Sequence, residues 1–179
     1  WEGDSWKIGG GSIWDAAAID PKAGLAMFAT GNPNPDMYGA NRKGTNIYTD
    51  SIVAVDVRTG KLAWYYQQIA HDVWDLDAVS APILTQAKDA SGKMVDVVIH
   101  GGKTGHVYVH DRATGKIIRF SEAMIPQENM WTLPTATGAR MLPGANGGVE
   151  WSPMAIDPKL HYAYAANLHQ PMTYQVEAS

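Results

Sequence analysis

Several residue types and patterns are scarce or missing. Cysteine is absent from the 179 residues, and phenylalanine occurs only twice. Without a thiol, the chain contains no cysteine nucleophile, zinc–cysteine site or disulfide. No stretch approaches the roughly 18 consecutive apolar residues that a membrane-spanning helix requires. Lys and Arg number 14 against 18 Asp and Glu, a formal net charge of −4. This lack of a basic surplus argues against nucleic acid as a partner.

The residues that are present are typical of a folded all-β protein. Charged residues make up 18% of the chain and hydrophobic residues 45%, which is too little charge and too much apolar material for a disordered segment. The 18 glycines, 10 prolines, 7 tryptophans and 8 tyrosines indicate many turns, and strands that carry amphipathic aromatic side chains. We therefore predict an all-β fold with few helices.

Two motifs occur twice along the chain. AIDPK at 18–22 returns at 155–159, and a tryptophan precedes both copies at the same distance, as Trp14 and Trp151. AVDVRTGKLAW at 54–64 and VHDRATGKIIRF at 109–120 share Asp-x-x-Thr-Gly-Lys. This second motif predicts a hairpin in which Asp accepts turn hydrogen bonds and Gly adopts the left-handed conformation. Repeats at such spacing favour a propeller over a sandwich or a barrel.

The same patterns predict short strands separated by long loops. Strands are expected at 14–19, 25–30, 51–57, 62–68, 95–100, 106–111, 154–157 and 162–167. Segments 32–46 and 124–146 are rich in Pro, Gly, Asn and Met and are expected to be surface loops. The first residue is Trp1 rather than Met, and we expect a piece of a longer protein whose export signal lies upstream.

At this point the ordered motifs resemble a known family. GDSWKIGGGSIWDAAAIDPK, FATGNP, DVRTGKLAW, HDVWDLD and GGKTGHVYVHDRATGK together resemble the quinoprotein alcohol dehydrogenases, which use pyrroloquinoline quinone (PQQ). The resemblance implies roughly three blades of an eight-bladed β-propeller, with residues 1–179 forming a domain that is incomplete at both ends. Propeller blades in this family are tied by a docking motif, Ala-x-Asp-x-x-Thr-Gly-x-x-x-Trp, which is matched by Ala54, Asp56, Thr59, Gly60 and Trp64. The second copy carries Arg119 in place of the tryptophan.

The resemblance also implies cofactor-binding residues. Trp14 matches the family tryptophan whose indole stacks under the PQQ ring, and Lys103 matches a cation that contacts the quinone oxygens. Asn146, in NGGVEW, is aligned more loosely with an asparagine that reaches the cofactor. Taken alone, Trp14 reads as a core tryptophan and Lys103 as a solubilising surface charge.

Three further residues match metal-binding and catalytic positions. Asn32 matches the family asparagine whose side-chain oxygen ligates the metal, and Asp75 matches the catalytic carboxylate that takes the alcohol proton beside that metal. Asp77 matches a second carboxylate of the lanthanide-dependent members, but glucose dehydrogenases of the superfamily carry Asp-x-Asp too, so calcium and a lanthanide both stay open. On an extended strand Asp75 and Asp77 would share one face. Without the resemblance, the cluster would be a solvated acidic loop.

The resemblance implies a function and a cellular setting. It implies PQQ- and metal-dependent oxidation of an alcohol or aldose to an aldehyde or lactone by hydride transfer to the quinone. Electrons would pass to cytochrome c or a membrane quinone, in the periplasm, and the full-length protein would form a homodimer. The family's ligating glutamate would lie upstream of Trp1, so the isolated chain is not expected to bind PQQ tightly. The alternative is a non-catalytic periplasmic β-propeller scaffold of the outer-membrane assembly lipoprotein type, which shares the docking repeats.

Overall fold

The computed structural model describes residues 1–177, and in this part of the chain the fold is all-β, as the sequence predicts. A single 3-10 turn, η1 (Ser5–Lys7), precedes the strands. The described residues include no helix long and apolar enough to cross a membrane. The strands are β1 (Ala18–Asp20), β2 (Leu25–Ala29), β3 (Ser51–Asp56), β4 (Leu62–Gln67), β5 (Ile83–Lys88), β6 (Met94–Gly101), β7 (Val107–Asp111), β8 (Ile117–Phe120), β9 (Ala139–Met141), β10 (Ala155–Asp157), β11 (Tyr162–Tyr164) and β12 (Met172–Tyr174).

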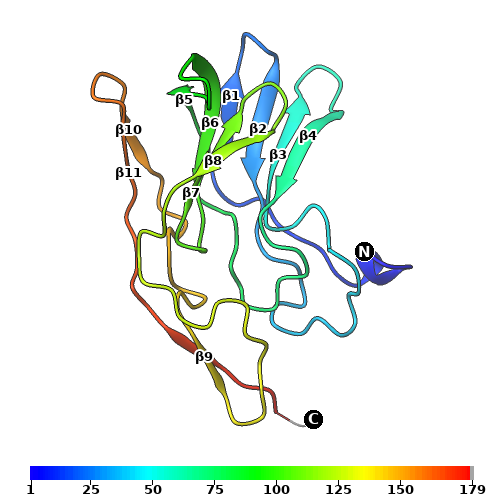
Figure 1. The fold of residues 1–179 in the computed structure, drawn as a ribbon. Coiled ribbons are helices and arrows are strands. Elements are labelled where there is room, and N and C mark those ends of the chain that lie inside the picture. Colours follow the sequence, from blue (N-terminus) through cyan, green and yellow to red (C-terminus); the bar gives the residue numbers. More distant parts are fainter. Residues whose placement is uncertain (178–179) are drawn as a thin grey trace.

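The strands form blade-like sheets in chain order. Two four-stranded antiparallel sheets, β1-β2-β3-β4 and β5-β6-β7-β8, stand side by side (Figure 1). The β10–β11 pair forms a further sheet, and β9 pairs with β12. Consecutive four-stranded meanders are the building blocks of a propeller. The two complete sheets and the β10–β11 pair therefore correspond to the roughly three blades expected from the sequence.

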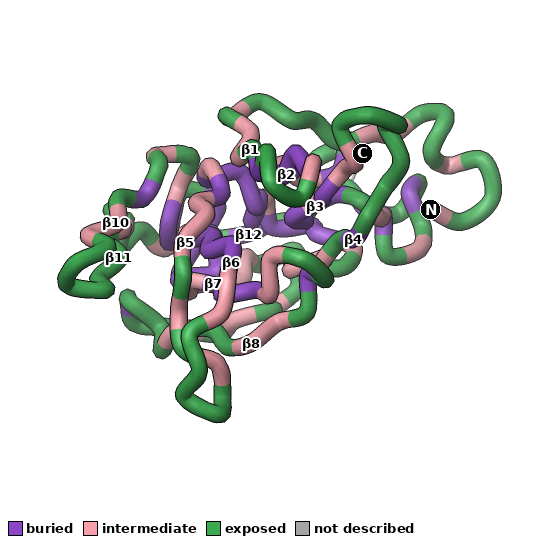
Figure 2. Tube along the Cα trace, turned by 90° about the horizontal axis from the view of Figure 1, so that it is seen from above, coloured by how far each residue is buried: buried purple, intermediate pink, exposed green. Residues whose placement is uncertain are grey.

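Alternating side chains pack the sheets against one another. Met27, Ile52 and Ala54 of the first sheet are fully buried and cluster with Val98 of β6. The neighbours of Val98 along β6, Val97 and Ile99, belong to the other face of the second sheet, which packs toward β10. Successive side chains of a strand point to opposite faces, so β6 contributes to two cores. Viewed from above, buried segments run through the centre and exposed ones surround them (Figure 2).

The repeated Asp-x-x-Thr-Gly motif forms the predicted turns and docks one sheet onto the next. Asp56 Oδ1 accepts hydrogen bonds from the backbone N–H groups of Arg58 and Thr59, at 3.0 and 2.9 Å. Trp64 Nε1 donates to the carbonyl of Arg112, at 3.2 Å, across to the second sheet. The ring of Trp64 covers Gly115, where a built Cβ would lie 2.4 Å from Trp64 Cε3. Trp64 therefore docks the first sheet on the second through one hydrogen bond and its contact with Gly115, as the resemblance implies.

Some expected elements differ from those in the structure. Residues 14–17 are not extended, so β1 begins only at Ala18. The strand signal missed β5, β9 and β12, because short strands with half-buried or mixed side chains show little alternation. Segment 124–146 contains β9, and segment 32–46 contains the fully buried Arg42 and Asn46. Neither segment is simply a surface loop.

Candidate functional site

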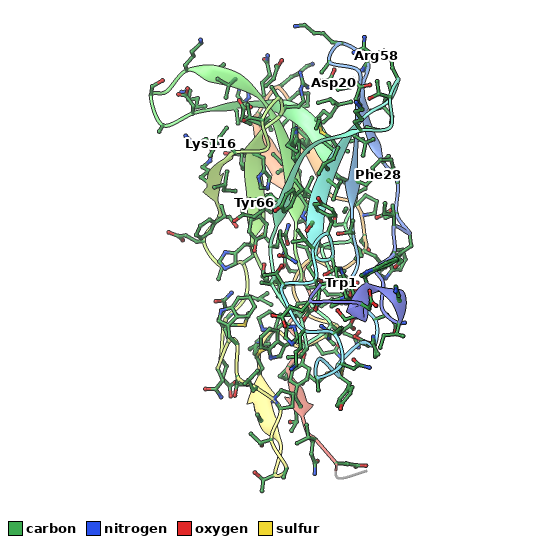
Figure 3. The ribbon with its side chains drawn as sticks, turned by 90° about the vertical axis from the view of Figure 1, so that its right-hand side faces the viewer. Trp1, Asp20, Phe28, Arg58, Tyr66 and Lys116 are labelled. Atoms are coloured by element: carbon green, nitrogen blue, oxygen red, sulfur yellow. The ribbon has the colours of Figure 1, made fainter. Side chains whose placement is uncertain are left out.

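All the site residues expected from the sequence lie on connections at one end of the sheets. In an antiparallel meander, the connection after the second strand and the one after the fourth return to the same end. This end is opposite the tight turns that carry Asp20, Arg58 and Lys116, and Trp1 lies on the side of the long connections (Figure 3). The connections concerned hold Trp14 before β1, Asn32 after β2, Asp75 and Asp77 between β4 and β5, Lys103 between β6 and β7, and Asn146 between β9 and β10.

Lys103 is the centre of the cluster. Its ammonium lies 2.7 Å from Asp77 Oδ2 and 3.4 Å from Asp75 Oδ2, and it donates to the Asp75 carbonyl at 2.9 Å. The side chains of Lys103 and Asp77 are each only 6% exposed. Lys103 is therefore not a solubilising surface charge, and Asp77 is not part of a solvated loop. Buried charges persist in this way only when they are paired.

The two carboxylates carry unequal pKa values. Burial and the side-chain hydrogen bond with Asp77 raise the pKa of Asp75 to about 8. Burial also acts to raise the pKa of Asp77, but the hydrogen bond from Asp75 and the Lys103 ammonium outweigh it and hold the pKa below its ordinary value. Two carboxyl groups with one cation between them thus share a proton at neutral pH. Lys103 supplies one positive charge to two carboxyl groups, so the pair can accept a further cation.

Asn32 and Trp14 lie beside the same carboxylate. The Asn32 backbone N–H donates to Asp77 Oδ1 at 2.7 Å, and the Asn32 side chain donates to Asp36. A Cβ built on Gly31 would lie 2.8 Å from Asp77 Oδ1 and 3.3 Å from Trp14 Nε1. Trp14 is 51% exposed, so its indole is a partly open flat face rather than a core side chain. The structure therefore brings together Asn32, Trp14 and the carboxylates.

A cavity adjoins this group of residues. It has a volume of about 380 Å³ and is lined by Gly10, Gly11, Ser12, residues 32–34 and Asp36. Its lining is mostly glycine and polar side chains, which offer hydrogen-bonding groups to a ligand. The glycines of the 9–11 run allow the backbone to approach this cavity closely.

The Asp72 carboxylate accepts two backbone hydrogen bonds from the segment that carries Asp75 and Asp77. Asp72 Oδ1 accepts from Trp74 N at 2.7 Å, and Asp72 Oδ2 accepts from Leu76 N at 2.8 Å. Asp75, between them, has φ of +62°, a left-handed conformation that aspartate tolerates better than most residues. The sequence predicts an extended strand for Asp75 and Asp77, but the structure has a turn there instead. They meet because the local turn directs both carboxylates toward Lys103.

Arg42 links this segment to the connection that carries Asn32. Its guanidinium is fully buried and donates to the carbonyls of Pro35 and Asp72 and to Asn46 Oδ1. Burial lowers the pKa of Arg42, and the charge of Asp72 opposes this effect. Sequence reasoning missed Arg42 because nothing local distinguishes it from a surface arginine. Asp72 lies within HDVWDLD, and no other feature of the sequence indicates its role.

The NGGVEW string holds Asn146, the expected cofactor contact, and a second residue that reaches the cluster. Asn146 is exposed, whereas Glu150, four residues later in the same NGGVEW string, places Oε1 3.8 Å from Lys103 Nζ. Val149 N donates to the Gly102 carbonyl at 3.1 Å, which anchors this string beside the Lys103 connection. The role of Asn146 at the cofactor stays a prediction, and Glu150 is a residue of the same string that the sequence did not single out.

The donor set suits part of a metal site and part of a quinone site. Carboxylate and amide oxygens, as supplied by Asp75, Asp77 and Asn32, are the ligands that hard cations prefer. Within residues 1–177, no group of three His, Cys, Asp or Glu side chains is arranged to hold a metal ion. The oxygens of Asp75, Asp77 and Asn32 would therefore make up only part of the ligand set of such a site. The half-exposed indole of Trp14 offers a stacking face for a flat ring.

Comparison with known proteins relates the chain as a whole to an enzyme family. The family described as "PQQ: Glucose/ethanol/alcohol dehydrogenase, beta-propeller domain" matches residues 1–132. An alcohol dehydrogenase (quinone), dehydrogenase subunit, of Gluconobacter oxydans is 32% identical over 95% of this chain and 25% of its own length. A lanthanide-dependent methanol dehydrogenase of Methylorubrum extorquens is 40% identical over 66% of this chain and 19% of its own.

A solved structure shows the same fold. The quinohemoprotein alcohol dehydrogenase ADHIIG of Pseudomonas putida HK5 superposes with a TM-score of 0.87, at 29% identity, over 100% of this chain and 29% of that one. The chain spans a third or less of the length of the relatives it matches. These relatives are oxidoreductases, and the match covers more than half of the chain. The chain belongs to the family of PQQ-dependent glucose, ethanol and alcohol dehydrogenase propeller domains.

Proposed function

We propose that the protein containing this chain oxidises an alcohol or an aldose to the aldehyde or lactone, with PQQ and a calcium or lanthanide ion. The observation that carries the proposal is the convergence of Asp75 and Asp77 on a buried cation, Lys103, with the Asn32 backbone N–H bound to Asp77. Packing alone gives no reason to bury two carboxylates of one connection beside a lysine of another. A stacking face, oxygen donors and a proton acceptor in one place serve this chemistry.

Asp75 is the proton acceptor of the proposed reaction. Without a metal ion, its pKa of about 8, raised by burial and by Asp77, leaves it mostly protonated at neutral pH. A multivalent cation beside it favours the ionised form. Asp75 then takes the hydroxyl proton of the substrate through a carboxylate oxygen. The Asp75 side chain is 24% exposed, which makes it the most accessible of the three acidic side chains that contact Lys103.

The remaining residues bind and orient. When bound, PQQ supplies the hydride acceptor, and the metal ion polarises its carbonyl. Trp14 offers the face on which the ring stacks. Asn32 and Asp77 would supply oxygen ligands to the ion, and the Lys103 ammonium would stabilise negative charge that develops near it.

The setting of the whole protein is part of the proposal. Because the chain spans a third or less of its relatives, we propose that residues 1–179 are part of a longer eight-bladed propeller domain. We place the protein in the periplasm, as a homodimer that passes electrons to cytochrome c or a membrane quinone. The quinone acceptor is supported by the name of the Gluconobacter relative, and the lanthanide by the name of the Methylorubrum relative.

The test is dye-linked dehydrogenase activity of the complete protein, reconstituted with PQQ and either calcium or lanthanum, on methanol, ethanol and glucose. Asp75→Asn is expected to lower kcat by 10²-fold or more, since a positioned acid–base group contributes about 10²- to 10⁴-fold. Asp89→Asn, at the opposite end of the second sheet, is the matched control and should leave kcat unchanged.

The metal dependence of that activity separates the remaining possibilities. Activity with lanthanum alone, abolished by Asp77→Ala, would identify Asp77 as a lanthanide ligand. Calcium-dependent oxidation of glucose would assign the protein to the sugar-oxidising members. Absence of activity with both metals, together with absence of PQQ binding, would refute the proposal and leave the non-catalytic scaffold.

A further inference from the structure

Lys103 contacts three carboxylates rather than two. Its ammonium lies 2.7 Å from Asp77, 3.4 Å from Asp75 and 3.8 Å from Glu150. The first two residues are the proposed metal-binding pair, and Glu150 reaches the ammonium from a different connection. The Lys103 ammonium therefore lies between two acceptors, the Asp75–Asp77 pair and Glu150. In this structure it is closer to the Asp75–Asp77 pair.

Glu150 is placed beside Lys103 by the backbone. A Cβ built on Gly148 would lie 2.3 Å from the Lys103 carbonyl oxygen, so only glycine allows the two connections to pack this closely. The Val149 N–H donates to Gly102, next to Lys103. Glu150 Oε1 is buried and has no hydrogen-bond partner within residues 1–177. A buried unpaired carboxylate oxygen is costly, and here it faces a nearby ammonium.

A metal ion at Asp75 and Asp77 conflicts with the present position of that ammonium. Two positive charges a few ångströms apart in a site of low dielectric repel by several kcal/mol. The ammonium must therefore leave the Asp77 oxygen when a cation binds there. Glu150 Oε1 is the remaining carboxylate oxygen in its reach, and a shift of about 1 Å brings it to ordinary hydrogen-bond distance.

We propose that Lys103 is the internal counter-ion of the Asp75–Asp77 pair in the metal-free protein, and that Glu150 receives its ammonium when the metal ion binds. Glu150 is thus a positioning residue that acts through Lys103. This inference rests on the proposed function, because the ion is the one that the proposed dehydrogenase uses. It assigns a role to a residue outside the metal-binding set.

The test is terbium titration of the complete protein, read as terbium luminescence excited through tryptophan, without PQQ or substrate. Glu150→Gln is expected to weaken terbium binding about 10-fold. Glu150→Asp keeps the charge but withdraws the carboxylate from Lys103, and it should also weaken binding, by at least 3-fold. Glu128→Gln removes a glutamate paired with Arg140 at the surface and should leave binding unchanged.

A second background separates relocation of Lys103 from simple loss of charge. In a Lys103→Met background there is no ammonium to relocate, so Glu150→Gln should change terbium affinity less than 3-fold. An equal effect of Glu150→Gln in both backgrounds, or wild-type affinity in Glu150→Asp, would overturn the role of Glu150 while leaving the metal site standing. Terbium binding that is absent from the wild type or insensitive to Asp77→Ala would instead refute the metal site, and the inference with it.

Discussion

Replacing Gly115 by alanine tests how the sheets are held together. Gly115 and Gly60 occupy the same place in the two copies of the repeated turn, with φ of +71° and +69°. A Cβ at Gly60 meets nothing within 4 Å, whereas a Cβ at Gly115 would lie 2.4 Å from Trp64 Cε3 and 2.6 Å from Trp64 Cδ2. The two glycines thus share a backbone conformation and differ only in what covers them.

This difference gives the expected magnitudes. An alanine in the left-handed region costs about 1–2 kcal/mol at either position. At Gly115 the added methyl must also displace the indole that docks the first sheet on the second, and overpacking of this kind costs about 1–3 kcal/mol. Gly60→Ala should therefore lower the free energy of unfolding by about 1–2 kcal/mol, and Gly115→Ala by about 2–5 kcal/mol.

The assay is equilibrium urea unfolding of the complete protein at fixed metal and PQQ concentrations, because bound ligands shift stability by themselves. Adding Trp64→Leu to both variants removes most of the ring that the new methyl meets. In that background the two alanine variants should cost the same. Equal costs in the wild-type background, or a Gly115→Ala cost that stays larger after Trp64→Leu, would refute the packing explanation.

Two further predictions concern buried polar groups. Asp72→Asn leaves one acceptor for two backbone N–H groups, those of Trp74 and Leu76. It should cost about 1–3 kcal/mol of unfolding free energy and lower kcat through Asp75, and wild-type values in both urea unfolding and steady-state kinetics would contradict this role of Asp72. Burial lowers the pKa of His100 to about 3, with His110 adding to the effect, and lowers the pKa of His110 to about 4. Because an unfolded histidine titrates near 6.5, the unfolded state binds more protons below that pH, and each histidine should cost about 1.4 kcal/mol of stability per pH unit from 6.5 down toward 4. His110→Gln should flatten the fall of unfolding free energy between pH 6 and pH 4.5, and an unchanged slope would show that His110 is not buried neutral.

The turns, most of the strands and the family can be predicted from local sequence. The Asp-x-x-Thr-Gly turn is readable because its hydrogen bonds join Asp56 to groups two and three residues away. Interactions this local are written in neighbouring letters. The strings around Trp14, Asn32, Asp75 and Lys103 carried the family resemblance for the same reason, since each is short and ordered along the chain.

Which of these residues meet, and which residues support them, depends on how the sheets pack. Lys103 lies 26 residues from Asp77 and the Arg42 guanidinium 30 residues from the Asp72 carbonyl it contacts. Such pairings depend on how two sheets and their connections return to one end of the fold. Glu150, rather than Asn146, reaches Lys103 because Gly148 lets two backbones touch. A close approach of this kind has no signature in neighbouring residues, and it becomes visible only once the sheets are packed.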